Sequence, residues 1–294
     1  MNYTSNFSLI EVTRAQMMAV RRDCNIDMEQ LNDDLDMLEK WCRSQDQLVE
    51  ALPYLGRDML ERFLIQAKGS LERTKQGIDK ALAVRGMIPD IMLNEKTITN
   101  LDKFCNLFDN VLITSLPKAN PEDGTRVILL RLMNENFEDL DLIECAKFGT
   151  FFVDVRMRHD YIFSDRVIFD FQYIKPSIIT KLNPIILKKL QILFIGAYKF
   201  KVKEKMVKRI RVHGSYEELY EVISKEILPK EYGGEGMSCS RLVEEWKNYI
   251  RSDDGQRIME NSHRLVSDVS KRNLFKFDEE YFGLPGSFKK INID

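Results

Sequence analysis

Two apolar runs separated by a helical pattern constrain the fold of this chain more than any other feature. Residues 126–132 and 166–171 are continuous enough in apolar character to be strands buried on both faces. Residues 140–155 between them have helical spacing, and a second helical pattern starts near Pro184 and precedes a third β-branched run at 210–213. This order predicts parallel pairing with right-handed crossovers. We therefore expect an α/β domain built on a mostly parallel sheet.

The residues before this domain predict a bundle of short helices. One helix has a buried stripe, a second runs from about Asp58 to Lys68, and a third begins after Ser70 and ends near Gly86. The stripe of the first consists of Leu31, Leu35, Leu38, Trp41 and Cys42. Such helices bury little surface alone, so we expect the bundle to pack on the α/β domain. We assign residues 1–98 to the helical module and 99–236 to the α/β domain. Residues 237–294 form an amphipathic helix, with Leu242, Trp246, Tyr249 and Ile250, and a tail.

Composition excludes several classes of protein. Of the 294 residues, 44% are hydrophobic and 31% charged, which is typical of a globular chain, and the formal net charge of −2 argues against nucleic-acid binding. The five cysteines are scattered without CxxC spacing, which indicates free thiols in a reducing compartment. We see no secretory signal and no apolar run near the roughly 20 residues that span a bilayer. Any membrane contact should therefore be peripheral.

Catalytic and metal-binding motifs are not found in the sequence. The three histidines, His159, His213 and His263, lie outside HExxH, and no GxSxG, GxxxxGK[ST] or GxGxxG is present. We interpret His213 as a structural residue at a strand end and expect His159 and His263 to be exposed. We predict that the protein is not an enzyme and has no cofactor or metal.

The C-terminal third carries a basic run and, after it, clear helix signals. Residues 199–211 contain seven Lys or Arg against one acid, Glu204, and several of these cations share a helix face. Ser215 and Glu218 have the spacing of a capping box, and Pro229 ends the helix that begins there. A run of this kind is most often a solvated face. The alternative is a site for phosphate or an anionic membrane.

These segments together resemble the CRAL-TRIO family of lipid carriers, which includes tocopherol-transfer-like and retinaldehyde-binding-like proteins. The resemblance covers roughly residues 55–236. It rests on the ordered set of His213-Gly-Ser215, Ile227-Leu-Pro-Lys-Glu-Tyr-Gly-Gly234, Asp123-Gly124, Val167-Ile-Phe-Asp170 and Leu182-Asn-Pro184. It implies a parallel sheet floor and surrounding helices that enclose one lipid in an apolar cavity.

The resemblance also implies two sets of site residues. The lipid-pocket wall would consist of Phe148, Phe151, Phe152, Val155, Ile168, Leu190, Leu193 and Tyr198. Without the resemblance, these would be interpreted as ordinary core residues. Lys205 and Arg209, assisted by Lys208 and Arg211, would grip the phosphates of phosphatidylinositol bisphosphate.

The chain departs from the family between Tyr198 and Lys199, where the family inserts a strand and most of a gate helix. The chain is either a divergent member of the family or the product of a skipped exon or a faulty gene model. We expect one long or kinked helix from Pro184 to the run at 210–213. The predicted function is binding and transfer of a small tocopherol-, retinoid- or phospholipid-like lipid in the cytoplasm, with transient phosphoinositide-dependent membrane docking. The alternative is a module that binds a membrane or protein surface without carrying lipid.

Overall fold

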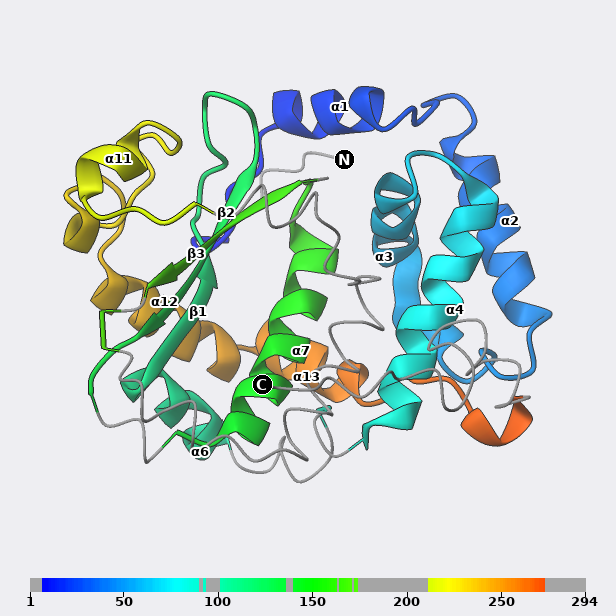
Figure 1. Ribbon diagram of the computed structural model, residues 1–294. Helices are drawn as coiled ribbons and strands as arrows, with labels where there is room; N and C mark the ends of the chain where they lie inside the picture. The colour runs from blue at the N-terminus through cyan, green and yellow to red at the C-terminus, as the bar shows by residue number, and fades with distance from the viewer. Residues whose placement is uncertain are drawn as a thin grey trace, which may run out of the picture.

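The computed structural model describes residues 7–89, 92–93, 101–135, 140–162, 164–170, 172–173 and 211–272. Helices come first along the chain: α1 (Arg14–Asp23), α2 (Leu31–Arg43), α3 (Leu52–Gln66) and α4 (Leu71–Met87). Helices α2, α3 and α4 gather at one side of the molecule and α1 lies across the top of the view, while the strands lie at the other side with α7 (Leu142–His159) between (Figure 1). The predicted helical N-terminal region beside a mixed α/β region is confirmed.

Local signals account for where the early helices begin. Ser70 caps α4, because its Oγ accepts a hydrogen bond from the Arg73 amide at 3.4 Å. Helix α3 starts at Leu52, earlier than the predicted Asp58, and is kinked at Gly56, where φ is 64°. Glycine adopts that conformation without a Cβ clash, so the chain turns there and continues as helix.

The sheet has the order β1-β2-β3 and is mixed. Strands β2 (Arg126–Leu132) and β3 (Asp165–Asp170) pair in parallel with α7 as the crossover, as predicted. Strand β1 (Val111–Ser115), which pairs antiparallel with β2, was not predicted. The described sheet therefore has one parallel and one antiparallel pair of strands, and the expectation of a mostly parallel sheet is corrected to that extent.

A third strand was predicted at 210–213. The structure describes residues 211–213 of this run, and for them the prediction is wrong. Residues 211–213 have no regular structure, and the Val212 side chain is 92% exposed. β-branched residues favour a strand only where a neighbouring edge is available for pairing. Residues 174–210, and with them the predicted long helix after Pro184, lie outside the described residues.

The remaining described elements are all helical. They are α6 (Leu101–Asn106), the short 3-10 turns η2 (Leu107–Asp109), η4 (Lys230–Tyr232) and η5 (Val269–Lys271), and the helices α11 (Tyr216–Tyr220), α12 (Cys239–Arg251) and α13 (Asp253–Ser262). The Ser215 hydroxyl caps α11 by accepting from the Glu218 amide, while Glu218 accepts from the Gly214 amide at 2.9 Å. The predicted capping box is thus present, except that the Glu218 carboxylate accepts from the amide of Gly214 and not from that of Ser215. Among the described helices, none combines the length and the apolar character that a membrane span requires.

Contacts cross both predicted domain boundaries. Leu9 and Ile10 are fully buried in the core of the α/β region, and the Glu11 amide donates to the Pro117 carbonyl at 2.8 Å. At the other end, the Ser267 amide donates to the Leu82 carbonyl of α4 at 3.0 Å. We call residues 7–12 the N-terminal strap and residues 263–272 the C-terminal strap. Each strap lies on the part of the molecule remote from it in sequence.

Candidate functional site

One face of the sheet is well covered along β1 and β2. Side chains alternate between faces along a strand, so the register places Leu112, Thr114, Val127, Leu129 and Ile168 together. The first four of these are completely buried. Trp246 of α12 donates from Nε1 to Thr114 Oγ1 at 2.8 Å, which fixes this helix against β1. We call this side the covered face.

The opposite side of the sheet is apolar and less well covered. Its strand residues are Val111, Ile113, Ile128, Leu130, Leu132, Val167 and Phe169, with Ser115 at the end of β1 and Arg126 and Asp165 at the start of β2 and β3. Val167 is 46% exposed and Phe169 59% exposed, whereas the covered face exposes none of Leu112, Val127 or Leu129. We call this side the apolar face. An apolar sheet face normally buries itself against another layer.

A buried ion-pair network closes one end of the apolar face. Arg126 is fully buried and lies 2.8 Å from Asp160, and Arg156 of α7 lies 2.7 Å from Asp165 and 3.0 Å from Asp160. Burial alone would raise the pKa of Asp160, but the two guanidinium groups outweigh it and lower that pKa below its ordinary value. Arg126 also donates to the carbonyls of Leu116, at 3.2 Å, and of Pro117 and Glu11. These cations are therefore fully engaged and hold the end of α7 to the sheet.

Four predicted pocket residues lie together on α7. Phe148, Phe151, Phe152 and Val155 are buried, and the rings of Phe148 and Phe152 have their centroids 5.4 and 5.8 Å from that of Trp246. The structure thus joins these side chains into an aromatic cluster between α7 and α12. Their role as a pocket wall stays a prediction.

The fifth described pocket residue, Ile168, lies on the covered face. Its neighbours Val167 and Phe169 are the β3 side chains that lie on the apolar face. These two were not among the predicted pocket residues, and two-residue alternation along β3 means that they cannot share a face with Ile168. The other three, Leu190, Leu193 and Tyr198, lie outside the described residues.

Only one of the predicted phosphoinositide ligands is described. Arg211 is exposed and has no ion-pair partner within the described part of the chain. Lys205, Lys208 and Arg209 lie outside it. The structure therefore leaves this basic site as a prediction.

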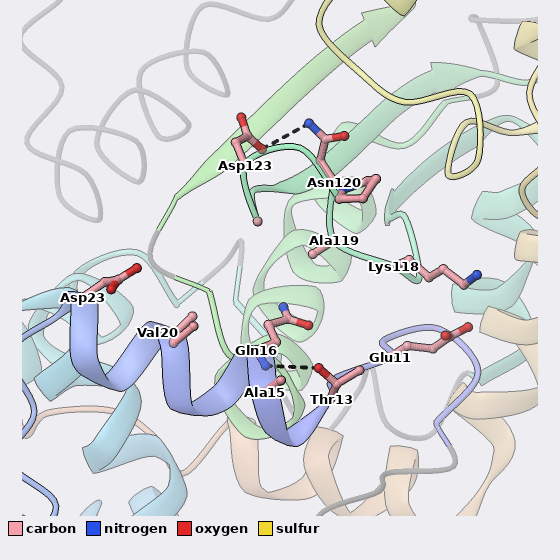
Figure 2. A pocket seen from close by; sticks show the side chains of 13 residues that line it. Glu11, Thr13, Ala15, Gln16, Val20, Asp23, Lys118, Ala119, Asn120 and Asp123 are labelled. Atoms are coloured by element: carbon pink, nitrogen blue, oxygen red, sulfur yellow. Dashed lines mark hydrogen bonds between the residues drawn. The ribbon is translucent and has the colours of Figure 1, made fainter.

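A shallow groove separates α1 from the loop between β1 and β2 (Figure 2). It has a volume of about 550 Å³, a floor of small side chains such as Ala15, Ala19 and Pro121, and acidic residues on its rim. Asp123 on the rim is ion-paired with Arg166, and Lys118 lies 3.2 Å from Glu226. Burial alone would raise the pKa of Asp123, but hydrogen bonds from Thr125 and Asn120 outweigh it and lower that pKa. The charges at the loop side of the groove are thus already neutralised by the protein.

The expectation that His159 is exposed is wrong. Its side chain is only 23% exposed, its Nε2 lies 3.2 Å from Asp254 Oδ2, and its ring packs against that of Phe7 with centroids 4.8 Å apart. His263 is also half-buried. Sequence polarity around a histidine does not reveal helix packing, and here the end of α7 meets the start of α13.

All five cysteines are free, and burial raises the pKa of Cys42 and Cys239 to about 12, which makes these thiols unreactive.

No protein-family model and no curated protein matches this chain.

Proposed function

We propose that this protein binds one hydrophobic lipid against the apolar face of its sheet and carries it between membranes. Docking on the membrane uses phosphatidylinositol bisphosphate, held by Lys205 and Arg209 with help from Lys208 and Arg211. The observation that supports lipid binding most is the exposure of Val167 and Phe169 on a face that is otherwise apolar. The sequence resemblance to CRAL-TRIO carriers supports the same use of the sheet as a floor.

The energetics of such a site favour a lipid over a polar ligand. Apolar burial contributes roughly 25 cal/mol per Å², so a chain that buries about 300 Å² gains roughly 7 kcal/mol before the cost of immobilisation is subtracted. The arginines at the closed end of the face already have carboxylate and carbonyl partners, so they would not compete for a ligand charge. The α7 aromatic cluster packs with Trp246 over the covered face, so the proposed wall opposite the apolar face consists of Leu190, Leu193 and Tyr198.

The experiment is native mass spectrometry of the purified protein with two matched variants. Val167 and Val49 are equally exposed, at 46% and 45%, but only Val167 lies on the apolar face. Val167→Asp should reduce copurifying lipid about tenfold, because a carboxylate beside the tail is costly to desolvate. Val49→Asp should leave it unchanged, and the milder Val167→Thr should give a smaller loss in the same direction.

The second candidate, a module that binds surfaces without carrying lipid, is favoured by the absence of the family's gate segment between Tyr198 and Lys199. Wild-type protein that carries no lipid and takes none from vesicles, yet still sediments with them, would establish this candidate and overturn the carrier. Equal loss of lipid in Val167→Asp and Val49→Asp would overturn the assignment to the apolar face.

A further inference from the structure

The groove between α1 and the loop that joins β1 to β2 has walls that the fold itself holds in place (Figure 2). Just before α1, the Glu11 amide donates to the Pro117 carbonyl of the loop at 2.8 Å. Within the loop, the Asn120 amide donates to the Thr125 carbonyl at 2.7 Å, and Asn120 Oδ1 accepts from the Ser224 amide at 3.3 Å. A ligand that enters such a preformed groove does not have to order its walls, which lowers the cost of binding.

The surface of the groove lacks large apolar side chains. Ala15 and Ala19 line it from α1, and Ala119 and Pro121 line it from the loop. A Cβ added at Gly124 would meet no heavy atom within 4 Å. Small residues allow the backbone of a ligand to approach closely, but they offer little apolar area to a ring or a lipid tail. The shape of the groove therefore suits an extended peptide.

Acids predominate among the charged residues that line the groove. On the loop side, Asp123 and Lys118 have partners outside the lining. On the α1 side, the Glu11 carboxylate has no ion-pair or hydrogen-bond partner among the described residues. Asp23, the last residue of α1, is paired at 3.0 Å with its exposed sequence neighbour Arg22, and exposed pairs of this kind contribute little. The α1 wall therefore presents two available carboxylates, one near each end.

We propose that this groove binds an extended, basic segment of a partner protein. Two Lys or Arg side chains of the segment pair with Glu11 and Asp23, and a backbone amide between them donates to the side-chain oxygen of Gln16. The Gln16 side chain points from α1 toward the loop (Figure 2), and its Nε2 donates to the Tyr161 carbonyl at 3.4 Å. Its Oε1 accepts no hydrogen bond within the described part of the chain.

The length of α1 sets the spacing of the two cations. Its 10 residues rise about 1.5 Å each, which makes the helix about 15 Å long, and Glu11 lies just before it. An extended chain advances about 3.3 Å per residue, with side chains on alternate sides, so cations six positions apart are about 20 Å apart and share a side. Such a pair reaches both ends of the α1 wall, whereas two adjacent cations reach only one end.

The test is a two-dimensional NMR titration of the full-length protein with terminally blocked nonapeptides of glycine and serine. The first peptide carries lysines at positions 2 and 8, the second carries them at positions 2 and 3, and the third has glutamates at positions 2 and 8. The first should bind several-fold more tightly than the second and should shift the amide signals of Ala15, Ala19 and Gly124. Because these two peptides have the same charge, non-specific attraction affects them equally. The third should not bind.

Paired variants test the two carboxylates. Glu11→Gln combined with Asp23→Asn should weaken binding of the first peptide about tenfold, the effect of losing two exposed ion pairs, and should abolish the difference between the first two peptides. The matched control is Asp27→Asn combined with Glu29→Gln, which removes the same charge from exposed residues outside the lining. This control should retain the wild-type preference.

A second pair of variants tests the groove itself. Ala19→Leu fills it and should block binding of the first peptide, whereas Met18→Leu changes an exposed residue of α1 outside the lining and should not. No binding of the first peptide, equal binding of the first two, equal losses in the two double variants, or unchanged affinity in Ala19→Leu would each overturn the proposal. None of these outcomes bears on lipid binding, because the substitutions lie outside the apolar face.

Discussion

At the scale of single residues, His159 links three helices and the N-terminal strap. It is the last residue of α7, it contacts Asp254 of α13 and Tyr249 of α12, and its ring packs on Phe7. Burial lowers the pKa of His159 below its ordinary value of 6.5, and the attraction of Asp254 offsets this only in part. Asp58 also favours the charged form, while Arg158 opposes it. The imidazole is therefore neutral at pH 7.

This pKa predicts a loss of stability in mild acid. The unfolded chain, with the ordinary pKa of 6.5, binds the proton more tightly than the folded protein does. The free energy of unfolding should therefore be highest above pH 6.5 and fall as the pH drops through the interval between the two pKa values. Urea denaturation between pH 7.5 and about pH 5.5 measures this, above the range in which most carboxylates titrate.

The control for this prediction is His159→Gln, which keeps a polar side chain near Asp254 but cannot titrate. Its free energy of unfolding should be flat over the same interval. A variant with the same acid sensitivity as the wild type would show that another group is responsible.

At the scale of elements, the amphipathic helices were the most predictable part of the fold. Leu31, Leu35, Leu38 and Cys42 are buried on α2 as their spacing indicates, and Leu242, Trp246 and Ile250 are buried on α12. Strand β1 was missed because five residues give too short a pattern to separate from a loop. The run at 210–213 was predicted from β-branched character alone, which cannot say whether a partner strand is present.

The site was less predictable than the helices, for a physical reason. The three residues after Arg166, namely Val167, Ile168 and Phe169, are all apolar. The sequence therefore does not show which of these side chains share a face of the sheet. That depends on pairing with β2, which is a property of the tertiary structure. For the same reason the sequence does not show that Ile168 lies on one face of the sheet and Val167 and Phe169 on the other.

The basic segment gives a prediction at this scale. Lys205→Ala combined with Arg209→Ala should weaken binding to vesicles that contain phosphatidylinositol bisphosphate. Each cation near an anionic surface contributes about 1 kcal/mol, so the pair should cost roughly tenfold or more in affinity at low salt, and less as salt screens the charges. Vesicle sedimentation at two salt concentrations measures this.

Lipid already bound should be unaffected by the same double substitution, because its tail is held by apolar burial. The matched control is Lys225→Ala combined with Lys230→Ala, which removes the same charge from outside the basic run. Unchanged vesicle binding with an intact circular dichroism spectrum would contradict the headgroup assignment and leave the run as a solvated face.

At the scale of the whole molecule, the two straps make the helical region and the α/β region depend on each other. Leu9 and Ile10 fill the α/β core, and Arg126 ties the strap down through the Glu11 carbonyl at 3.1 Å. The C-terminal strap ends with Arg272, which is ion-paired with Asp79 of α4. Neither region keeps all of its contacts if the other unfolds.

We therefore predict a single cooperative transition that is sensitive to the strap. Leu9→Ala should lower the free energy of unfolding by about 2–5 kcal/mol, the usual cost of removing a fully buried leucine side chain. In a Trp41→Phe background, the fluorescence of Trp246 reports on the α/β core, and far-ultraviolet circular dichroism reports mainly on the helices. The two signals should shift together in guanidinium chloride. Separate midpoints, with only the fluorescence responding to Leu9→Ala, would mean that the straps do not couple the regions.

The straps also set an order of events on the ribosome. The strap residues Leu9 and Ile10 are synthesised well before the other members of their buried core, which lie between Leu93 and Met259 in the sequence. These two apolar residues therefore lack most of their native partners until the later part of the core has been synthesised. During that interval, Leu9 and Ile10 are the apolar side chains that a chaperone for nascent chains would bind.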